Sequence, residues 1–312
     1  MNIKTKNLIS INDLSVNEIN EIIDSTDAYK EILKRDIKKV PTLRGKTIIT
    51  LFYEASTRTR MSFELAAKRM GADVSNIAVA TSAVSKGENL KDTIRTLEAM
   101  GVDLFIMRHW QSGSPYIAAS VAKAGIINAG DGSHEHPTQA LLDMYTVKSK
   151  KKDFKNLNVA IIGDVYHSRV ARSNIIALKR LGANVTLIGP PTLMPPNIED
   201  LGVTISYKLD DIINEFDVLY VLRIQLERQK KGLFPGAQEY MKLYGLNQER
   251  LKKAKRNALV MHPGPMNIGL EITEEVANSQ NAAIIEQVHN GVAVRMSILN
   301  HMLGGRHDES LN

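Results

Sequence analysis

Short apolar runs that alternate with helix-like segments constrain the fold of this 312-residue chain most strongly. A first helix is predicted where Ser15 and Glu18 stand at capping-box spacing ahead of an apolar pattern. Runs of strand length then follow: KTIITLFY, ADVSNIAV, VDLFIMR and GIINAG, and, after a helix-like link from Pro137, LNVAIIGD, NVTLIG, FDVLYVLR and NALVMH. Such alternation is typical of parallel strands joined by right-handed crossover helices.

The alternation occurs in two sets, which predicts an α/β chain of two doubly wound parallel-sheet domains linked by helices. We expect the first domain over residues 1–136, a linking helix over 137–150 and the second domain over 151–283. Apolar residues at helical spacing also predict a last helix over about 284–304. We expect this helix to return to the first domain and complete it.

Polar clusters follow most of the predicted strands. They are STRTR, MRH, HEHPTQ, GDVYHSR, LRIQ and HPGP. Ligands of open α/β sheets bind beyond the carboxyl ends of the strands. Any single cluster is explained equally well as a loop with satisfied hydrogen bonds, but their recurrence in both halves predicts an active site in a cleft between the domains.

Composition excludes several classes of protein. The chain has no cysteine, which excludes disulfides, thiolate metal sites and thiol catalysis. No stretch has the pattern of a signal peptide or a membrane span, so we expect a cytoplasmic protein without a membrane partner. The net charge of +6 permits nucleic-acid binding, yet only 5% of residues are aromatic and could stack on bases. Surplus positive charge equally suits an enzyme with anionic substrates.

The STRTR segment stands where a predicted strand gives way to a predicted helix. A helix N-terminus offers N–H groups and the positive end of the helix dipole, which together attract an anion. Ser56, Thr57 and Thr59 add hydroxyl donors, and Arg58 adds a planar fork that matches phosphate. An N-cap serine with arginines paired to surface acids is the alternative. The repeated Thr-Arg pair ahead of an amphipathic helix favours phosphate.

These segments together resemble the aspartate carbamoyltransferase family along essentially the whole chain. The matching segments are FYEASTRTRMSFE, SAVSKGENLKDT, MRH, HPTQALLD, GDVYHSR, LRIQLER and HPGP, in the family's order and spacing. The resemblance implies transfer of the carbamoyl group of carbamoyl phosphate to the amine of L-aspartate, a step of pyrimidine synthesis, with no metal or organic cofactor. It also implies that the first domain binds carbamoyl phosphate and the second binds aspartate.

Carbamoyl transfer needs donors for a developing oxyanion, neutralisation of the leaving phosphate and alignment of two highly charged substrates. The resemblance implies that Arg58, Thr59, Arg108 and His136 act in catalysis. It assigns the phosphate to Ser56, Thr57, Arg58, Thr59 and Arg108, the carbonyl oxygen to Thr59, Arg108 and His136, and the carbamoyl NH2 to Gln139 and the backbone around Pro263, Gly264 and Pro265. In this scheme His136 is a donor, and the leaving phosphate accepts the amine proton.

The two carboxylates of aspartate are each best held by an arginine. By resemblance Arg169 takes the α-carboxylate, and Arg223 with Gln225 takes the β-carboxylate. Ion pairing within the second domain is the alternative for either arginine alone. By analogy with the family, Glu54 is expected to pair with Arg169 or Arg228 when the cleft closes.

In the family the loop SAVSKGENLKDT reaches the site of the neighbouring subunit. We therefore expect Ser82 and Lys86 to serve an adjacent site, with Lys86 among the aspartate-binding residues. The resemblance implies a homotrimer as the smallest active unit. The sequence leaves open whether regulatory chains or a dihydroorotase bind this trimer.

Other functions fit the sequence less well. His134 and His136 lack a third metal ligand, and IIGDVYHSR has one glycine where a dinucleotide enzyme would have G-x-G-x-x-G. No nucleic-acid-binding motif is present. Ornithine carbamoyltransferases share S-T-R-T-R but carry a cysteine in a late H-C-L-P loop, where this chain has HPGP. Arg223 with Lys86 also suits a second carboxylate better than the amine of ornithine.

Overall fold

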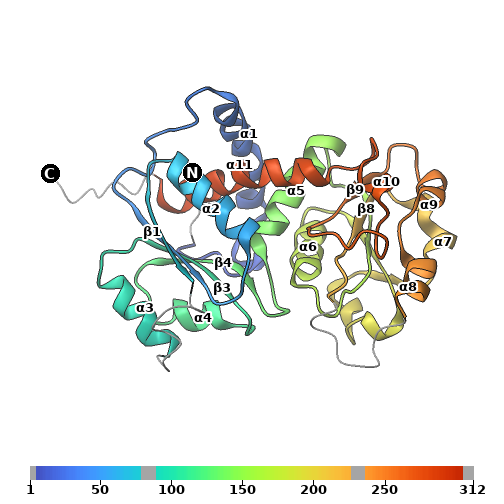
Figure 1. Ribbon diagram of the computed structural model, residues 1–312, viewed down its shortest axis with the longest axis horizontal. Coiled ribbons are helices and arrows are strands. Elements are labelled where there is room, and N and C mark those ends of the chain that lie inside the picture. Colours follow the sequence, from blue (N-terminus) through green and yellow to red (C-terminus); the bar gives the residue numbers. More distant parts are fainter. Residues whose placement is uncertain (1–4, 79–88, 226–235, 305–312) are drawn as a thin grey trace. The chain divides into compact units, whose positions relative to one another are not determined.

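The computed structural model describes residues 5–78, 89–225 and 236–304 (Figure 1). The chain divides into two compact units, one formed by Met1–Tyr145 with His289–Asn312 and the other by Thr146–Val288. The divisions fall inside α5 (Pro137–Lys151) and inside α11 (Ile284–Leu303), so both helices contribute residues to each unit. Within the described parts of the chain, no helix combines the length and the apolar character needed to cross a membrane.

The first unit is built on a four-stranded sheet in the order β2-β1-β3-β4, with every pair parallel. The interior strands are buried along almost their whole length, as expected for a parallel sheet covered on both faces. The register sets Phe52 beside Arg108, so the loop after β1 starts next to the end of β3. The strands are β1 (Thr47–Phe52), β2 (Asp73–Ala78), β3 (Leu104–His109) and β4 (Gly125–Asp131).

Helices complete the first unit around this sheet. The capping box between Ser15 and Glu18 is present, which confirms the predicted start of the first helix. The last helix is tied to the first one, because the Ser297 hydroxyl donates to the carbonyl of Ile22 at 2.9 Å. The helices are a 3-10 turn (Ile11–Asp13), α1 (Val16–Lys34), α2 (Thr57–Arg69), α3 (Leu90–Glu98), α4 (Ser114–Ala119) and the first part of α5.

The second unit has a five-stranded parallel sheet in the order β7-β6-β5-β8-β9. Its edge strand β7 was not predicted, because it is only three residues long and has no buried residue. The strands are β5 (Asn158–Ile162), β6 (Asn184–Ile188), β7 (Thr204–Ser206), β8 (Val218–Val221) and β9 (Leu259–Met261). The helices are α6 (Arg169–Arg180), α7 (Leu209–Ile212), α8 (Ala237–Tyr244), α9 (Gln248–Lys253) and α10 (Glu274–Ala277), with short 3-10 turns at Pro191–Leu193, Ile198–Leu201 and Ile213–Glu215.

Both sheets are doubly wound, which confirms the predicted fold class. In the first unit the chain moves outward from β1 to β2 and then from β3 to β4 in the other direction; in the second it does so from β5 and from β8. Ligands of such sheets bind beyond the carboxyl ends of the strands where the order reverses. The fold therefore directs attention to the residues after β1 and β3 and to those after β5 and β8.

Candidate active site

The start of α2 carries the predicted phosphate-binding residues directly after β1. Ser56 is the N-cap in an extended conformation, but its side chain makes no capping hydrogen bond to its own helix. The caps Ser15 and Asn89 of α1 and α3 do accept such a bond. Thr57 and Arg58 are exposed, whereas Thr59 is 9% exposed. The first turn of α2 thus offers donors to an anion in solution, with Thr59 the most enclosed of them.

Arg108 ends β3 beside this turn, and its side chain is 12% exposed. It donates through Nη2 to Glu54 Oε1 at 2.7 Å and through Nη1 to the carbonyl of Ala129 at 3.3 Å. Its guanidinium therefore lies between the loop after β1 and the end of β4. The ion pair with Glu54 was not predicted. Pairing of Glu54 with Arg169 or Arg228 stays a prediction for the substrate-bound enzyme, since Arg228 lies outside the described residues.

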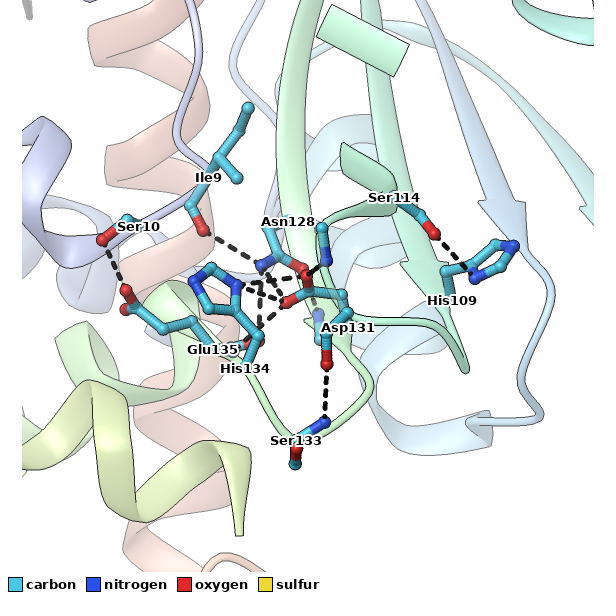
Figure 2. Close-up of polar contacts among 12 residues, drawn as sticks. Ile9, Ser10, His109, Ser114, Asn128, Asp131, Ser133, His134 and Glu135 are labelled. Atoms are coloured by element: carbon cyan, nitrogen blue, oxygen red, sulfur yellow. Dashed lines mark hydrogen bonds and ion pairs between the residues drawn. The ribbon is translucent and has the colours of Figure 1, made fainter. Parts of the chain in front are cut away.

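The loop after β4 carries His136 and is held by a buried polar network (Figure 2). The Asp131 carboxylate accepts hydrogen bonds from Gly113 N and Asn128 Nδ2, both at 2.7 Å, and from Glu135 N at 3.2 Å. Burial raises the pKa of Asp131, but hydrogen bonds from His134, Gly113 and Asn128 outweigh burial, so this pKa lies below its usual value. His134 contacts the same carboxylate at 3.1 Å through Nδ1. The His134 side chain therefore interacts with a residue of its own loop.

Glu135 anchors the same loop to the N-terminal segment. Its carboxylate accepts from the Ser10 hydroxyl and from the Ile11 N–H, the latter at 3.1 Å. Since Glu135 precedes His136 directly, the backbone that carries His136 is fixed from both ends of the loop. His136 is 4% exposed and stands just before Pro137, a residue suited to the first position of a helix. Among the described residues, no three His, Asp or Glu side chains are grouped so that they could hold a metal ion.

Gln139 lies in the first turn of α5, three residues beyond His136. Its Nε2 donates to Asp143 Oδ1 at 3.0 Å, one helical turn further on. In the first unit the predicted residues therefore stand at or after the carboxyl ends of β1, β3 and β4. They are Ser56–Thr59, Arg108, His136 and Gln139. Donors for an anion and an acceptor for an NH2 group are both among them.

In the second unit Arg169 occupies the first position of α6, after β5. It is 4% exposed. Ser168 caps this helix by accepting from Ala171 N at 3.1 Å, and Asp164 holds His167 through its backbone N–H at 3.2 Å and its Nδ1 at 2.9 Å. A cation at a helix N-terminus opposes the helix dipole. This position therefore does not serve helix stability, and binding of an anionic ligand by Arg169 stays a prediction.

Arg223 and Gln225 follow β8, and both are half-buried. The residue between them is tied to the loop after β9, because Asn267 Nδ2 donates to the carbonyl of Ile224 at 3.1 Å. That loop carries the predicted backbone site at Pro263, Gly264 and Pro265, with a cis bond between Gly264 and Pro265. A hydrogen bond therefore joins the segment of Arg223 and Gln225 to the loop that carries the predicted backbone site.

The side chains of His262 and Glu271 hold the loop after β9 in place through hydrogen bonds. His262 Nδ1 accepts from Gly264 N at 2.8 Å, so its proton is on Nε2, which faces Glu271 Oε1 at 3.3 Å. Glu271 Oε1 also accepts from Asn267 N at 2.6 Å. Both side chains are fully buried.

Sequence reasoning missed the supporting residues Asp131, Glu135, Asn267 and Glu271. Asp131 and Glu135 stand at or just after the end of β4 next to predicted ligands, and only this position could have drawn attention to them. Glu135 and Asn267 also have partners far away in the sequence, at Ser10 and Ile224. Ser82 and Lys86 lie outside the described residues.

Comparison with known proteins gives the chain a family. Residues 6–149 match the model of the aspartate/ornithine carbamoyltransferase carbamoyl-P binding domain, and residues 155–302 match that of the Asp/Orn binding domain. The aspartate carbamoyltransferase catalytic subunit of Moorella thermoacetica is 59% identical over 98% of this chain and 99% of that protein. The corresponding subunit of Halothermothrix orenii is 54% identical over the whole of both chains.

Solved structures agree with these matches. Aspartate transcarbamoylase from Trypanosoma cruzi in complex with carbamoyl phosphate superposes with a TM-score of 0.88 at 33% identity, covering 97% of each chain. Ornithine carbamoyltransferase from Pyrococcus furiosus superposes with a TM-score of 0.86 at 27% identity, covering 98% of this chain and 99% of the other. This chain belongs to the aspartate/ornithine carbamoyltransferase family.

Proposed function

We propose that this chain is the catalytic subunit of an aspartate carbamoyltransferase. It transfers the carbamoyl group of carbamoyl phosphate to L-aspartate, giving N-carbamoyl-L-aspartate and phosphate, the committed step of de novo pyrimidine (UMP) biosynthesis. One observation carries the choice of acceptor: the Moorella aspartate enzyme shares 59% of its residues with this chain and the Pyrococcus ornithine enzyme 27%. The Trypanosoma enzyme has been seen with carbamoyl phosphate and aspartate together.

The residues of the first unit can perform the transfer. The aspartate amine attacks the carbamoyl carbon, the C–N bond forms, the carbonyl oxygen gains charge, and the bond to the phosphate oxygen then breaks. Arg108, Thr59 and His136 would donate to the charged oxygen, while the first turn of α2 with Arg58 would hold the phosphate. The departing phosphate would accept the amine proton, so the step balances in atoms and charge. Preorganised donors of this kind are usually the largest single contribution to such a reaction.

The residues of the second unit suit the acceptor. Arg169 would bind the α-carboxylate, and Arg223 with Gln225 the β-carboxylate. The proposal keeps residues 1–136 with 284–304 as the carbamoyl-phosphate domain, 137–150 as the link and 151–283 as the aspartate domain. The descriptions of the two matching family models support this division of roles. The meeting of the two sets in an interdomain cleft stays a prediction.

The proposal includes a cytoplasmic homotrimer in which Ser82 and Lys86 serve the adjacent subunit's site. Lys86→Ala and Arg58→Ala chains should then be nearly inactive alone but active when refolded together. In a ring, every mixed trimer has one junction with both residues intact, so about a quarter of all sites recover after equal mixing. Hybrids detected by native mass spectrometry without recovered activity would show that Lys86 does not act across subunits.

A carbamoyl-transfer assay that offers aspartate and ornithine in parallel tests the activity. We expect carbamoyl aspartate and phosphate in equal amounts and no citrulline. Citrulline without turnover of aspartate would replace this function with that of the ornithine branch.

A further inference from the structure

The orientation of Gln139 is fixed by its partner. Asp143 is fully buried, and its Oδ1 accepts the hydrogen bond from Gln139 Nε2 at 3.0 Å. A carboxylate only accepts hydrogen bonds, so the NH2 of the Gln139 amide must face it. The amide oxygen of Gln139 then points away from Asp143, on the opposite side of the planar group.

Arg295 of α11 supports this arrangement. It is 4% exposed, and burial lowers the pKa of its guanidinium to about 10, a fall that the charge of Asp143 opposes. Arg295 therefore stays charged at neutral pH and offsets the buried carboxylate. A buried charge is retained only where a partner and hydrogen bonds compensate its desolvation.

The same arginine reaches the phosphate-binding helix. Its Nη1 donates to the Ser62 hydroxyl at 2.9 Å, and its guanidinium carbon lies 4.9 Å from the centre of the Phe63 ring. Both residues belong to α2, whose first turn carries STRTR. The cation whose charge acts on Asp143 is thus packed on α2.

We propose that Asp143, backed by Arg295, is a positioning residue that presents the amide oxygen of Gln139 to the carbamoyl NH2, so that the site selects a carbamoyl over a methyl-bearing acyl phosphate. This inference deepens the proposed function and rests on it. A Gln139 amide turned the other way would place one NH2 against another. Acetyl phosphate has a methyl group in place of the NH2 and gains nothing from the oxygen.

Asp143→Asn separates orientation from charge and shape. Asparagine can donate or accept, so both orientations of Gln139 find a partner, and the turned one becomes populated. We expect the KM for carbamoyl phosphate to rise about threefold to tenfold, the range for one neutral hydrogen bond. The ratio of kcat/KM for carbamoyl phosphate over acetyl phosphate should fall by a similar factor. The inhibition constant of inorganic phosphate, which lacks the acyl group, should stay within about twofold of wild type.

A double-mutant cycle with Gln139→Ala gives the decisive measurement. In the Gln139→Ala background, Asp143→Asn should have no further effect on the KM for carbamoyl phosphate. Asp103→Asn is the matched control: Asp103 is an ion-paired acid of the same unit that accepts from Thr47 N at 2.8 Å and Lys46 Nζ at 3.0 Å, just before β3. That variant should leave the KM unchanged.

Three outcomes would overturn the inference. They are an Asp143→Asn effect that persists in the Gln139→Ala background, an equal weakening of inorganic phosphate, and an unchanged acyl-phosphate ratio. If the Asp143→Asn variant fails to fold, a double variant that combines Asp143→Asn with Arg295→Met removes both buried charges. The same double-mutant cycle with Gln139→Ala then applies to that variant. A wild-type protein that forms no carbamoyl aspartate overturns the proposed function; an active wild type with an additive cycle overturns the inference alone.

Discussion

Replacement of Glu271 by methionine should loosen the loop after β9 and weaken aspartate binding. Glu271 receives the Asn267 N–H at 2.6 Å and the His262 Nε2–H at 3.3 Å. Both bonds end on the same oxygen, Oε1, so glutamine could keep both of them, whereas methionine removes the acceptor altogether. Methionine leaves the Asn267 N–H and the His262 Nε2–H without this acceptor, and the histidine cannot offer a lone pair there instead, because its Nδ1 already accepts from Gly264 N.

The magnitude follows from these two contacts. A hydrogen bond to a charged group contributes about 1.5–3 kcal/mol. With both bonds lost, we expect the free energy of unfolding to fall by about 3 kcal/mol, twice the lower of these figures, because the bond to His262 is long. Since Asn267 also holds the carbonyl of Ile224 at 3.1 Å, Arg223 and Gln225 lose their support. We expect the KM for aspartate to rise about tenfold, equivalent to about 1.4 kcal/mol.

Urea unfolding followed by circular dichroism measures the first effect, and steady-state kinetics with aspartate varied measures the second. Ile268→Ala is the control, since this neighbour of Asn267 is 50% exposed and its side chain contributes nothing to the network. The control should keep the wild-type KM. An unfolding free energy for Glu271→Met within about 0.5 kcal/mol of wild type would refute the assigned bonds. A destabilised variant with the wild-type aspartate KM would refute the link to Arg223 and Gln225.

Three further predictions concern single residues. Arg108→Ala and His136→Ala should each lower kcat by about 10²–10³, the usual effect of one lost oxyanion donor; an unchanged kcat in a folded variant would remove that residue from the chemistry. Arg223→Ala should chiefly raise the KM for aspartate, and an unaltered KM would move the β-carboxylate elsewhere. Burial lowers the pKa of His109 below its ordinary 6.5, so the unfolded chain binds more protons at this histidine than the folded chain does. The contribution of His109 to the free energy of unfolding should therefore be fully present above about pH 6.5 and be lost as pH falls through the lowered pKa. Unfolding free energies from pH 7.5 to pH 5 should fall less steeply for His109→Asn, and equal slopes would contradict this origin.

The sequence could predict what is local in the chain. Apolar runs of strand length, the capping box at Ser15 and the polar segments after strands are each encoded within a few residues. These features sufficed to predict the doubly wound fold, and they place the candidate site residues after the carboxyl ends of strands. Strand β7 escaped because three partly exposed residues carry no periodic signal, and their pairing depends on β6.

Contacts between distant segments could not be predicted in the same way. Ser10 and Glu135 are 125 positions apart, and Glu54 meets Arg108 only because the sheet register sets Phe52 beside Arg108. No local pattern encodes such a register. Candidate substrate-binding residues could be proposed because their residue types suit phosphate and carboxylate, whereas the acids that hold them in place resemble any other acid in the sequence.

The placement of those acids has a physical reason. A site for two highly charged substrates needs donors that are already oriented before the substrates arrive, since reorientation during the reaction would raise the barrier. Buried carboxylates can impose such an orientation because they only accept hydrogen bonds, and an unsatisfied one would be strongly destabilising. Asp131 and Glu135 do this for the loop that carries His136, Asp143 does it for Gln139, and Glu271 does it for the loop after β9. The carboxylate of Asp143 excludes one orientation of the Gln139 amide, and Asp143→Asn should therefore damage substrate recognition more than its loss of stability alone would explain.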